Sequence, residues 1–243
     1  MNKAKCEVSI VCCYYNEINI LKKKFQDFIQ KREKFNFSNE IIIADNNSTD
    51  GTIDYLREIE KRNIKNLKII YNKKNLGKGG SIKKCCEIAN GNYIAIFDID
   101  EYFTDDLVSG IETIIEKKID FLIGSRILEN KNFIYKKNYY GVIFFSKLIN
   151  IFFNTNLTDA AGATKIFDKN KFISINISTS GFDFEFDLIC KFAKLKHSIG
   201  EYPIKYSPRT FSEGKKIRAI KDGIEILKTI LFNIVKSKKN ILK

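Results

Sequence analysis

The sequence predicts an α/β fold: a mixed, mainly parallel sheet with helices on both faces, followed by an amphipathic helix at the end of the chain. Three observations support this class. Apolar runs of five to seven residues alternate with segments of helical periodicity through the first hundred residues. Polar residues bound each run, as expected of strands buried on both faces. The last segment repeats apolar residues every three or four positions.

The first half of the chain reads as four strands joined by three helices. The predicted strands are 7–13, 40–44, 67–71 and 93–97, and the predicted helices are 18–32, 52–61 and 81–89. Asp50 precedes the second helix as a plausible N-cap. Ligands of such sheets bind beyond the carboxyl ends of the strands. The residues that follow each strand are therefore the candidates for a functional site.

The second half is less regular. It predicts strands at 121–123 and 163–167, an aromatic segment at 133–153, and a helix at 184–195. The final helix begins near Ile217, and residues 215–243 hold nine basic and two acidic side chains. We therefore divide the chain into a catalytic domain, 1–214, and a basic amphipathic helix, 215–243, suited to contact at a membrane surface.

The net charge of the chain favours particular classes of binding partner. The 243 residues include 42 Lys and Arg against 29 Asp and Glu, a formal charge of +13. Such an excess favours phosphates, nucleic acid or an acidic membrane face. A codon bias toward lysine is an equally good explanation, because Ile and Asn are also abundant while Trp is absent.

Cysteine spacing and the first residues indicate the compartment. The six cysteines include two adjacent pairs and fit neither a zinc site nor a disulfide framework, so we expect reduced, packed thiols. The N-terminus lacks the apolar core of a signal peptide. We expect a cytoplasmic protein, associated with the cytoplasmic face of a membrane. No apolar stretch reaches the roughly 18 residues of a spanning helix.

The first three strand ends carry polar residues of different kinds. Tyr15 and Glu17 follow the first strand, and Asp45 ends the second, where a carboxylate can bond a ribose or base edge. The same residues are also ordinary turn and cap formers. After the third strand, Gly77 permits close approach to a phosphate and Lys78 supplies charge at a helix start. The spacing matches neither a Walker loop nor GxGxxG.

Two carboxylates follow the fourth strand. Asp98 and Asp100 are separated by one residue, so they point to the same side and repel unless a cation lies between them. Hard oxygen ligands beside a diphosphate suit Mg²⁺ or Mn²⁺. An acidic turn that caps the next helix is the alternative. The acid, the glycine-lysine loop and the DxD pair come on successive units of one parallel sheet, which favours a shared crevice.

The chain resembles a known family in these and later motifs. The segments are YYNE, ADNNSTDGT, NLGKGGS, FDID, GSR, LTD, GFDFE, YSPR, EGKKI and DG. They resemble the family 2 inverting glycosyltransferases of the GT-A fold, in particular the branch similar to dolichyl-phosphate mannose synthase and other polyprenyl-phosphate glycosyltransferases. The resemblance covers nearly the whole chain. The late PR, EGKKI and DG string is the most specific part.

The resemblance implies roles for individual residues. The implied donor-binding residues are Tyr15, Glu17, Asp45, Gly77, Lys78, Asp98 and Lys215. The implied metal ligands are Asp98 and Asp100, and the implied phosphate contacts are Arg126, Arg209 and Lys215. There are two departures. Tyr102 stands where relatives place a further metal ligand, so Glu101 is expected to substitute, and Ala160 and Ala161 follow the LTD motif where relatives have an acidic or amide residue.

These roles imply metal-dependent, inverting transfer of a hexose from a GDP- or UDP-sugar to a polyprenyl phosphate. Its phosphate oxygen is already an anion, so positioning and charge neutralisation by Asp100, Arg126 and Arg209 suffice. Lys136 and Lys137 precede an apolar segment and are expected to recruit the lipid headgroup.

The alternative acceptor is a saccharide hydroxyl in surface polysaccharide synthesis, which requires a carboxylate base. Asp183 and Glu185 are the candidates for that base. A sugar nucleotidyltransferase is disfavoured because YYNE replaces a glycine-rich loop. A nucleic-acid-binding module predicts interleaved basic and aromatic residues and no paired acids at strand tips.

Overall fold

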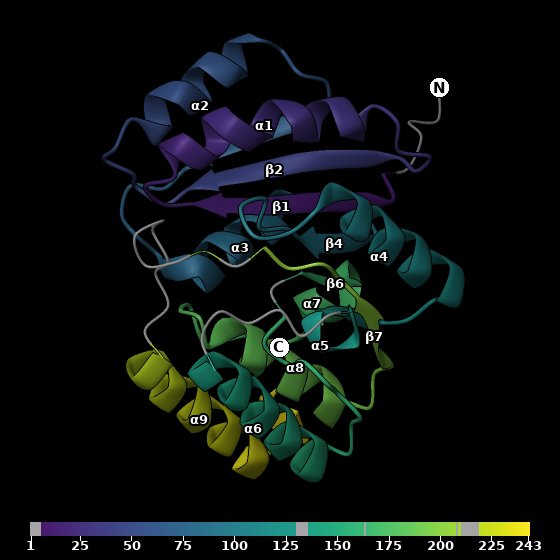
Figure 1. Ribbon diagram of the computed structural model, residues 1–243. Helices are drawn as coiled ribbons and strands as arrows, with labels where there is room; N and C mark the ends of the chain where they lie inside the picture. Colours follow the sequence, from purple (N-terminus) through teal and green to yellow (C-terminus); the bar gives the residue numbers. More distant parts are fainter. Residues whose placement is uncertain (1–5, 130–135, 163, 208, 210–218) are drawn as a thin grey trace.

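The computed structural model describes residues 6–129, 136–162, 164–207, 209 and 219–243. A seven-stranded sheet in the order β3-β2-β1-β4-β6-β5-β7 forms the centre of the molecule, and helices cover both of its faces (Figure 1). This is the mixed, mainly parallel α/β sheet that the sequence predicts.

The first four strands form the parallel part of the sheet. They are β1 (Val8–Tyr14), β2 (Asn39–Asp45), β3 (Leu67–Tyr71) and β4 (Tyr93–Ile96), joined by α1 (Ile18–Arg32), α2 (Thr52–Lys61) and α3 (Gly77–Ile88). In Figure 1, α1 and α2 lie on one side of this sheet and α3 on the other. The parallel strands bring all four carboxyl ends to one edge.

Side chains alternate between two cores along each buried strand. Ile10 packs on the side of α1, α2 and α4, whereas the next residue, Val11, packs on the side of α3, α8 and α9. Successive side chains of a strand point to opposite faces, and both faces are covered here. The continuous apolar runs in the sequence therefore reflect burial on both sides.

The second half completes the sheet by longer-range pairings. It contains α4 (Thr104–Lys117), β5 (Phe121–Ser125), α5 (Arg126–Glu129), α6 (Lys136–Phe153), β6 (Lys165–Asp168), α7 (Lys169–Ser174), α8 (Phe184–Lys194), β7 (Ile199–Pro203), α9 (Ala219–Val235) and a 3-10 helix (Lys238–Asn240). The strand β6 is antiparallel and lies between β4 and β5, while β7 runs parallel to β5.

The structure corrects the sequence prediction in four places. The last helix, expected over 215–243, ends at Val235 and is followed by a separate 3-10 helix. The strand expected at 163–167 begins at Lys165, and residue 163 lies outside the described residues. The strand β7 was not predicted. The third helix begins at Gly77, four residues before the predicted start, so the glycine-lysine loop is its first turn. Gly77 has a φ of +73°, and a Cβ on Gly79 would lie 2.4 Å from the Cβ of Phe184. Glycine is therefore required for α3 to reach α8.

Helices α6 and α9 pack against each other and against α8 (Figure 1). The start expected for the last helix, Ile217, lies outside the described residues. Ile226 and Ile230 of α9 are buried in the core. Among the described residues, no helix is long and apolar enough to cross a membrane. The six cysteines form no disulfide, in agreement with the sequence.

Candidate active site

A cavity of about 510 Å³ lies at the carboxyl ends of β1, β4 and β5. The starts of α3 and α8 and the first halves of α6 and α9 form the rest of its wall. It collects most of the residues that the sequence singled out. Those lining it are Tyr15, Glu17, Gly77, Lys78, Asp98, Asp100, Glu101, Arg126, Glu185 and Arg209. Residues separated by almost 200 positions thus share one site.

Two predicted site residues that the structure describes are not in this wall. Asp45 is fully buried, and its Oδ2 accepts a hydrogen bond from Ser48 N at 3.0 Å, while the adjacent Asn46 lines the cavity. Asp183 is not among the lining residues; its Oδ2 accepts from Thr229 Oγ1 of α9 at 2.8 Å. Lys215 lies outside the described residues.

The two carboxylates of the DxD pair both line the cavity, as their spacing predicts. Ile99, between them, points the other way and is 3 % exposed in the core. The side chains of Asp98 and Asp100 are 19 % and 15 % exposed. Each carboxylate is paired with a different cation, Lys78 for Asp98 and Arg209 for Asp100, and the two cations come from different halves of the chain.

Asp98 belongs to a buried chain of charges. Lys78 Nζ lies 2.6 Å from Asp98 Oδ2 and 2.8 Å from Glu185 Oε1, and Lys165 Nζ lies 2.8 Å from Glu185 Oε2. Burial alone lowers the pKa of Lys78, but Asp98 and Glu185 outweigh it and hold that pKa well above its usual range. Burial raises the pKa of Glu185, but Lys165 and Lys78 bring it below its usual value. Lys78 and Glu185 therefore carry charge at neutral pH.

Asp100 pairs with a residue near the end of the chain. Arg209 NH2 lies 2.7 Å from Asp100 Oδ2, and Arg209 NH1 lies 3.0 Å from Glu17 Oε2. Lys24 Nζ also donates to the backbone carbonyl of Asp100 at 2.7 Å. Burial and the neighbouring Asp98 raise the pKa of Asp100 to about 7, against the opposing effect of Arg209. Asp100 is therefore the acid of this site whose charge changes near neutral pH.

Arg126 is anchored by Asp159, the aspartate of the LTD motif, for which the sequence predicted no role. Asp159 accepts from Arg126 Nε at 2.7 Å, from NH2 at 2.8 Å and from the backbone N at 3.0 Å. Asp159 is fully buried and Arg126 is 7 % exposed. Burial alone lowers the pKa of Arg126, but Asp159 holds it well above its usual range. This bidentate pair fixes the guanidinium as a permanent cation.

An aromatic pair completes this side of the cavity and explains the Tyr102 departure. The guanidinium of Arg126 lies 5.0 Å from the ring centroid of Tyr206, which packs 5.6 Å from the ring of Tyr102. Tyr102 is 4 % exposed. The hydroxyl of Tyr206 lies 3.5 Å from Glu101 Oε1. Tyr102 thus packs on the tyrosine that contacts Arg126, and Glu101, the expected substitute metal ligand, lines the cavity.

The structure also places residues in the wall that the sequence did not identify. Asn46 Nδ2 donates to Asn75 Oδ1 at 2.8 Å, and Asn46 Oδ1 accepts from Leu76 N at 2.8 Å, which ties the end of β2 to the start of α3. Both asparagines line the cavity. The position of Asn46 directly after β2, and of Asn75 in the loop between β3 and α3, was a usable signal. From the second half come Gly141, Phe145 and Ile226, together with Lys137 and the DG pair Asp222 and Gly223, which the sequence had singled out.

The donor set is suited to a divalent cation that also binds a diphosphate. Among the described residues, no group of three or more His, Cys, Asp and Glu side chains comes together around a metal position. Two carboxylates match Mg²⁺ or Mn²⁺, which commonly take few protein ligands and share substrate phosphate oxygens. The residues therefore fit a metal held jointly with a nucleotide.

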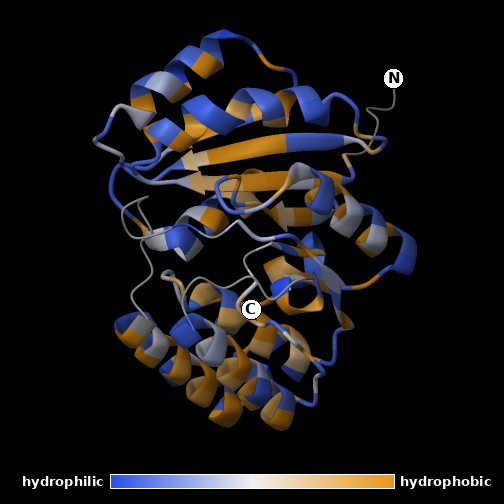
Figure 2. Ribbon diagram, viewed as in Figure 1, coloured by the Kyte–Doolittle hydropathy of each residue, from blue (hydrophilic) through white to orange (hydrophobic). Residues whose placement is uncertain are grey.

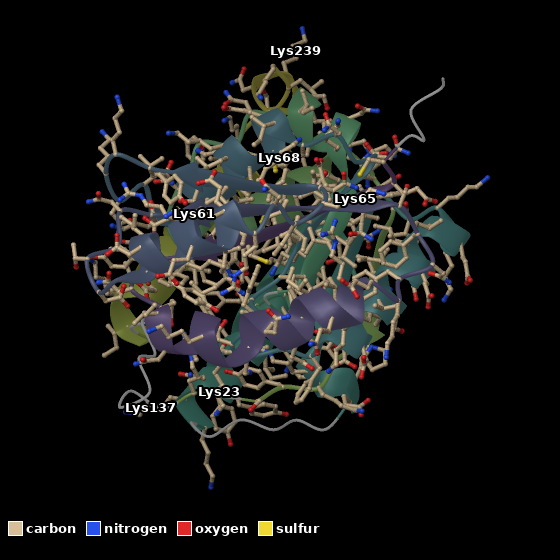
Figure 3. The ribbon with its side chains drawn as sticks, turned by 90° about the horizontal axis from the view of Figure 1, so that it is seen from above. Lys23, Lys61, Lys65, Lys68, Lys137 and Lys239 are labelled. Atoms are coloured by element: carbon tan, nitrogen blue, oxygen red, sulfur yellow. The ribbon has the colours of Figure 1, made fainter. Side chains whose placement is uncertain are left out.

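Figure 3 labels six lysines. In this view Lys61, Lys65 and Lys68 lie near one another, Lys23 and Lys137 lie together at another edge, and Lys239 lies apart. A nucleic-acid interface would require basic side chains gathered along one face. The labelled lysines form no single continuous group in this view.

Comparison with known sequences gives a family. The glycosyl transferase family 2 profile matches residues 9–175. The dolichyl-phosphate beta-glucosyltransferase of Saccharomyces cerevisiae is 27 % identical over 92 % of this chain and 73 % of its own length. The abequosyltransferase RfbV of Salmonella typhimurium is 34 % identical over 46 % of this chain and 33 % of its own length. This chain therefore spans only a third of that second relative.

Solved structures share the fold. Glucosyl-3-phosphoglycerate synthase of Mycobacterium tuberculosis, solved with Mn²⁺, UDP and phosphoglyceric acid, superposes with a TM-score of 0.66 at 16 % identity, over 97 % of this chain and 81 % of that one. Mannosyl-3-phosphoglycerate synthase of Rubrobacter xylanophilus gives 0.67 at 15 % identity, over 94 % and 72 %. With the matched profile and the cavity at the strand ends, the chain belongs to glycosyl transferase family 2 and has the GT-A fold.

Proposed function

We propose that this protein transfers a hexose from a nucleotide sugar to a polyprenyl phosphate, with inversion and with a divalent cation. The observation that carries the proposal is the cavity, which joins paired aspartates, three anchored cations and the inner faces of two apolar helices. The sequence resemblance named mannose. Two relatives aligned over 92 % of this chain are dolichyl-phosphate beta-glucosyltransferases, so glucose is the sugar to test first.

The donor half of the cavity is built from the first hundred residues. Tyr15, Asn46 and Asn75 would contact the nucleoside, and Lys78 would meet the diphosphate once it leaves Asp98. Asp98 and Asp100 would hold Mg²⁺ or Mn²⁺, with Glu101 nearby. Such a cation would offset the negative charge on the departing nucleoside diphosphate. Asp45 lies beneath this surface and would act through Asn46 rather than by contact.

The acceptor half supplies fixed positive charge. Arg126 and Arg209 would bind the phosphate of the acceptor and orient one of its oxygens toward the anomeric carbon. That oxygen attacks as the bond to the nucleoside diphosphate breaks, so the configuration inverts. No strong base is required, because the acceptor oxygen is already ionised. Positioning and electrostatic stabilisation therefore account for the chemistry.

The contacts of the two candidate bases disfavour a saccharide hydroxyl as acceptor. Lys78 and Lys165 both pair with Glu185, and its pKa lies below its usual value, so it is a poor proton acceptor. Asp183 bonds Thr229 and does not line the cavity.

The exposed faces of α6 and α9 suit a lipid substrate. Figure 2 shows the two helices side by side and rich in apolar residues. Their exposed apolar side chains include Tyr140, Phe144, Ile151, Phe152, Ile220, Ile224, Leu231, Phe232 and Val235. Residues of the same helices, Gly141 and Gly223, line the cavity. Contact of this face with the membrane surface would bring the acceptor headgroup to Arg126. The division of the chain at residue 214 stays a prediction.

The test is transfer in vesicles. Purified protein is mixed with phosphatidylglycerol-containing vesicles that carry polyprenyl phosphate, with radiolabelled UDP-glucose or GDP-mannose and Mn²⁺, and the lipid phase is counted. Label in the lipid phase that requires both metal and polyprenyl phosphate is the expected result. Label that appears only with a soluble saccharide acceptor would replace this proposal with the saccharide reaction.

A further inference from the structure

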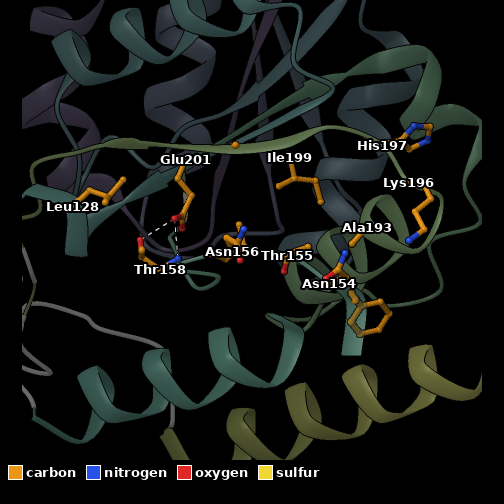
Figure 4. A pocket seen from close by; sticks show the side chains of 13 residues that line it. Leu128, Asn154, Thr155, Asn156, Thr158, Ala193, Lys196, His197, Ile199 and Glu201 are labelled. Atoms are coloured by element: carbon orange, nitrogen blue, oxygen red, sulfur yellow. Dashed lines mark hydrogen bonds between the residues drawn. The ribbon is translucent and has the colours of Figure 1, made fainter. Parts of the chain in front are cut away.

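A second cavity, of about 510 Å³, lies away from the candidate active site, between the end of α6, the end of α8 and β7. Glu201 of β7 forms part of its wall, and Figure 4 shows this side chain turned toward Thr158. None of the roles assigned so far involves Glu201. Its contacts lead to Arg126 by two routes.

Glu201 accepts three hydrogen bonds from two successive residues. Thr158 N and Thr158 Oγ1 both donate to Oε2 at 2.8 Å, and Asp159 N donates to Oε1 at 2.8 Å (Figure 4 shows the bonds to Thr158). An ionised carboxylate can only accept, and here both of its oxygens are used. Glu201 therefore fixes the backbone of the turn that carries Asp159.

The first route passes through hydroxyl groups to the residue before Arg126. Ser125 Oγ lies 2.7 Å from Thr158 Oγ1. Because the Thr158 hydroxyl donates its proton to Glu201, Ser125 is the donor in the Ser125–Thr158 bond. Ser125 Oγ in turn accepts from Leu128 N at 3.3 Å. Glu201 thus sets the donor-to-acceptor direction of a chain of hydrogen bonds that ends in the first turn of α5.

The second route passes through Asp159 to the arginine itself. Glu201 holds the Asp159 backbone, and the Asp159 carboxylate holds both the side chain and the backbone N of Arg126. The strand register supports this route, because β7 pairs directly with β5, with Glu201 opposite Ile123. Arg126 follows β5 immediately. Glu201 therefore lies on the strand next to β5, which Arg126 follows directly.

We propose that Glu201 is a positioning residue for Arg126: it holds the Thr158–Asp159 turn in the one arrangement that aims the guanidinium into the cavity. Glutamine cannot replace it. The amide carbonyl of glutamine accepts the Thr158 bonds, but its NH₂ group then faces Asp159 N, which is also a donor. The Asp159 backbone loses its partner, and Arg126 loses its fixed direction. The effect on transfer rests on the proposed function, whereas the geometry does not.

The direct test is NMR of the Arg126 side chain in Glu201→Gln. We expect exchange of the Arg126 Nε–H with water to become about tenfold faster, because its bond to Asp159 opens more often. Glu40→Gln is the matched control. Glu40 is also buried, at 4 % exposed, and accepts from Ser9 Oγ and Asn90 N at the other end of the sheet. Faster exchange in Glu201→Gln but not in Glu40→Gln supports the proposal, and equal exchange in both overturns it.

A second variant keeps the test valid if Glu201→Gln does not fold. Thr158→Val removes the hydroxyl route and leaves both backbone bonds to Glu201 in place. We expect a smaller increase in Arg126 Nε–H exchange, and unchanged exchange in this variant would contradict the first route. These measurements need no substrate, so they remain decisive even if the proposed reaction is wrong.

Transfer kinetics add the functional consequence. Glu201→Gln is expected to lower kcat/KM for polyprenyl phosphate by about tenfold, with KM for the nucleotide sugar unchanged. In an Arg126→Lys background the same change should have little further effect, because both act through one group. Additive losses would show that Glu201 acts on the fold and not through Arg126.

Discussion

The two halves of the sheet contribute to the site in different ways. In the first half, β1 to β4 run parallel and place Glu17, Asp98 and Asp100 directly after strand ends. In the second half, the antiparallel β6 separates β4 from β5, and its site residues are held by buried partners. Arg126 depends on Asp159, and Glu185 depends on Lys165. The acids of the first half thus follow strand ends and pair with cations there, whereas the charges of the second half are held by fully buried partners from distant segments.

This difference shows where each half is vulnerable. A strand end keeps its place when a single side chain is changed, because the ladder of backbone bonds holds it. A buried ion pair leaves an uncompensated charge when one partner is lost. Substitutions at the strand ends should therefore affect activity more than stability. Substitutions in the second half should affect both.

The largest expected effect is on activity in the first half. Asp98→Asn with Asp100→Asn should reduce metal-dependent transfer by about a thousandfold or more, because the cation and the diphosphate lose their anionic ligands. The unfolding midpoint should fall only modestly, because Lys78 still pairs with Glu185 and Arg209 still pairs with Glu17. Initial rates in the vesicle assay measure the loss. Asp105→Asn, an exposed acid on α4, is the control and should keep the full rate.

Next in size is the loss of a buried charge partner in the second half. Asp159→Asn should lower the free energy of unfolding by about 3–5 kcal/mol, because Arg126 stays buried without its carboxylate. Urea denaturation followed by circular dichroism measures this. Combining Asp159→Asn with Arg126→Met should recover part of the loss. If the double variant were less stable by the sum of both single effects, the pair would not be coupled.

The junction between the halves should be sensitive to a single methyl group. Gly79→Ala in α3 should destabilise by about 1–3 kcal/mol, since the new Cβ would lie 2.4 Å from Phe184 Cβ of α8. Gly141→Ala in α6 is the control, because nothing lies within 4 Å of its Cβ position. That change should stabilise by about 0.5–1 kcal/mol through helix propensity. Thermal melting of Gly79→Ala and Gly141→Ala tests this prediction. Equal changes in their melting temperatures would contradict a close contact between residue 79 and Phe184.

The smallest expected effect is a pH dependence in the first half. Burial raises the pKa of Glu40, but bonds from Lys68, Ser9 and Asn90 bring it below its usual value. A lowered pKa in the folded state stabilises the protein above the unfolded pKa of about 4.3, and this contribution disappears as the pH falls through the folded pKa. The stability difference between wild type and Glu40→Gln, about 1 kcal/mol at pH 6, should therefore shrink toward pH 3. If the stability difference between wild type and Glu40→Gln grew as the pH fell, the prediction of a lowered pKa for Glu40 would be contradicted.

The sequence predicts the first half well because its signals are local. Helices 18–32 and 52–61 match α1 and α2 in both bounds, since amphipathic spacing and polar turns mark them. The strand β7 escaped prediction because its five residues, IGEYP, include glycine, glutamate and proline, and pairing with the distant β5 makes it a strand. The buried pair between Lys165 and Glu185 had one local sign in the sequence, a lysine within the otherwise apolar predicted strand.

The same division holds for the site. The spacing of Asp98 and Asp100 alone predicted that both side chains point to the same side, because side chains alternate along an extended chain. Nothing local shows that Asp159 would reach Arg126, since 33 residues separate them. Asp183 was expected as a base for its acidity, and the structure shows it bonded to Thr229. Roles that depend on packing between distant segments could not be predicted from residue type.

The most direct test of the central claim is calorimetry of donor binding. UDP-glucose and GDP-mannose are each titrated into the wild-type protein, with Mn²⁺ and with EDTA. The account predicts saturable binding of one nucleotide sugar with Mn²⁺ and a loss of most of that affinity in EDTA, because Asp98 and Asp100 bind the diphosphate through the metal. Binding of equal affinity in EDTA, or no binding of either nucleotide sugar, would contradict it.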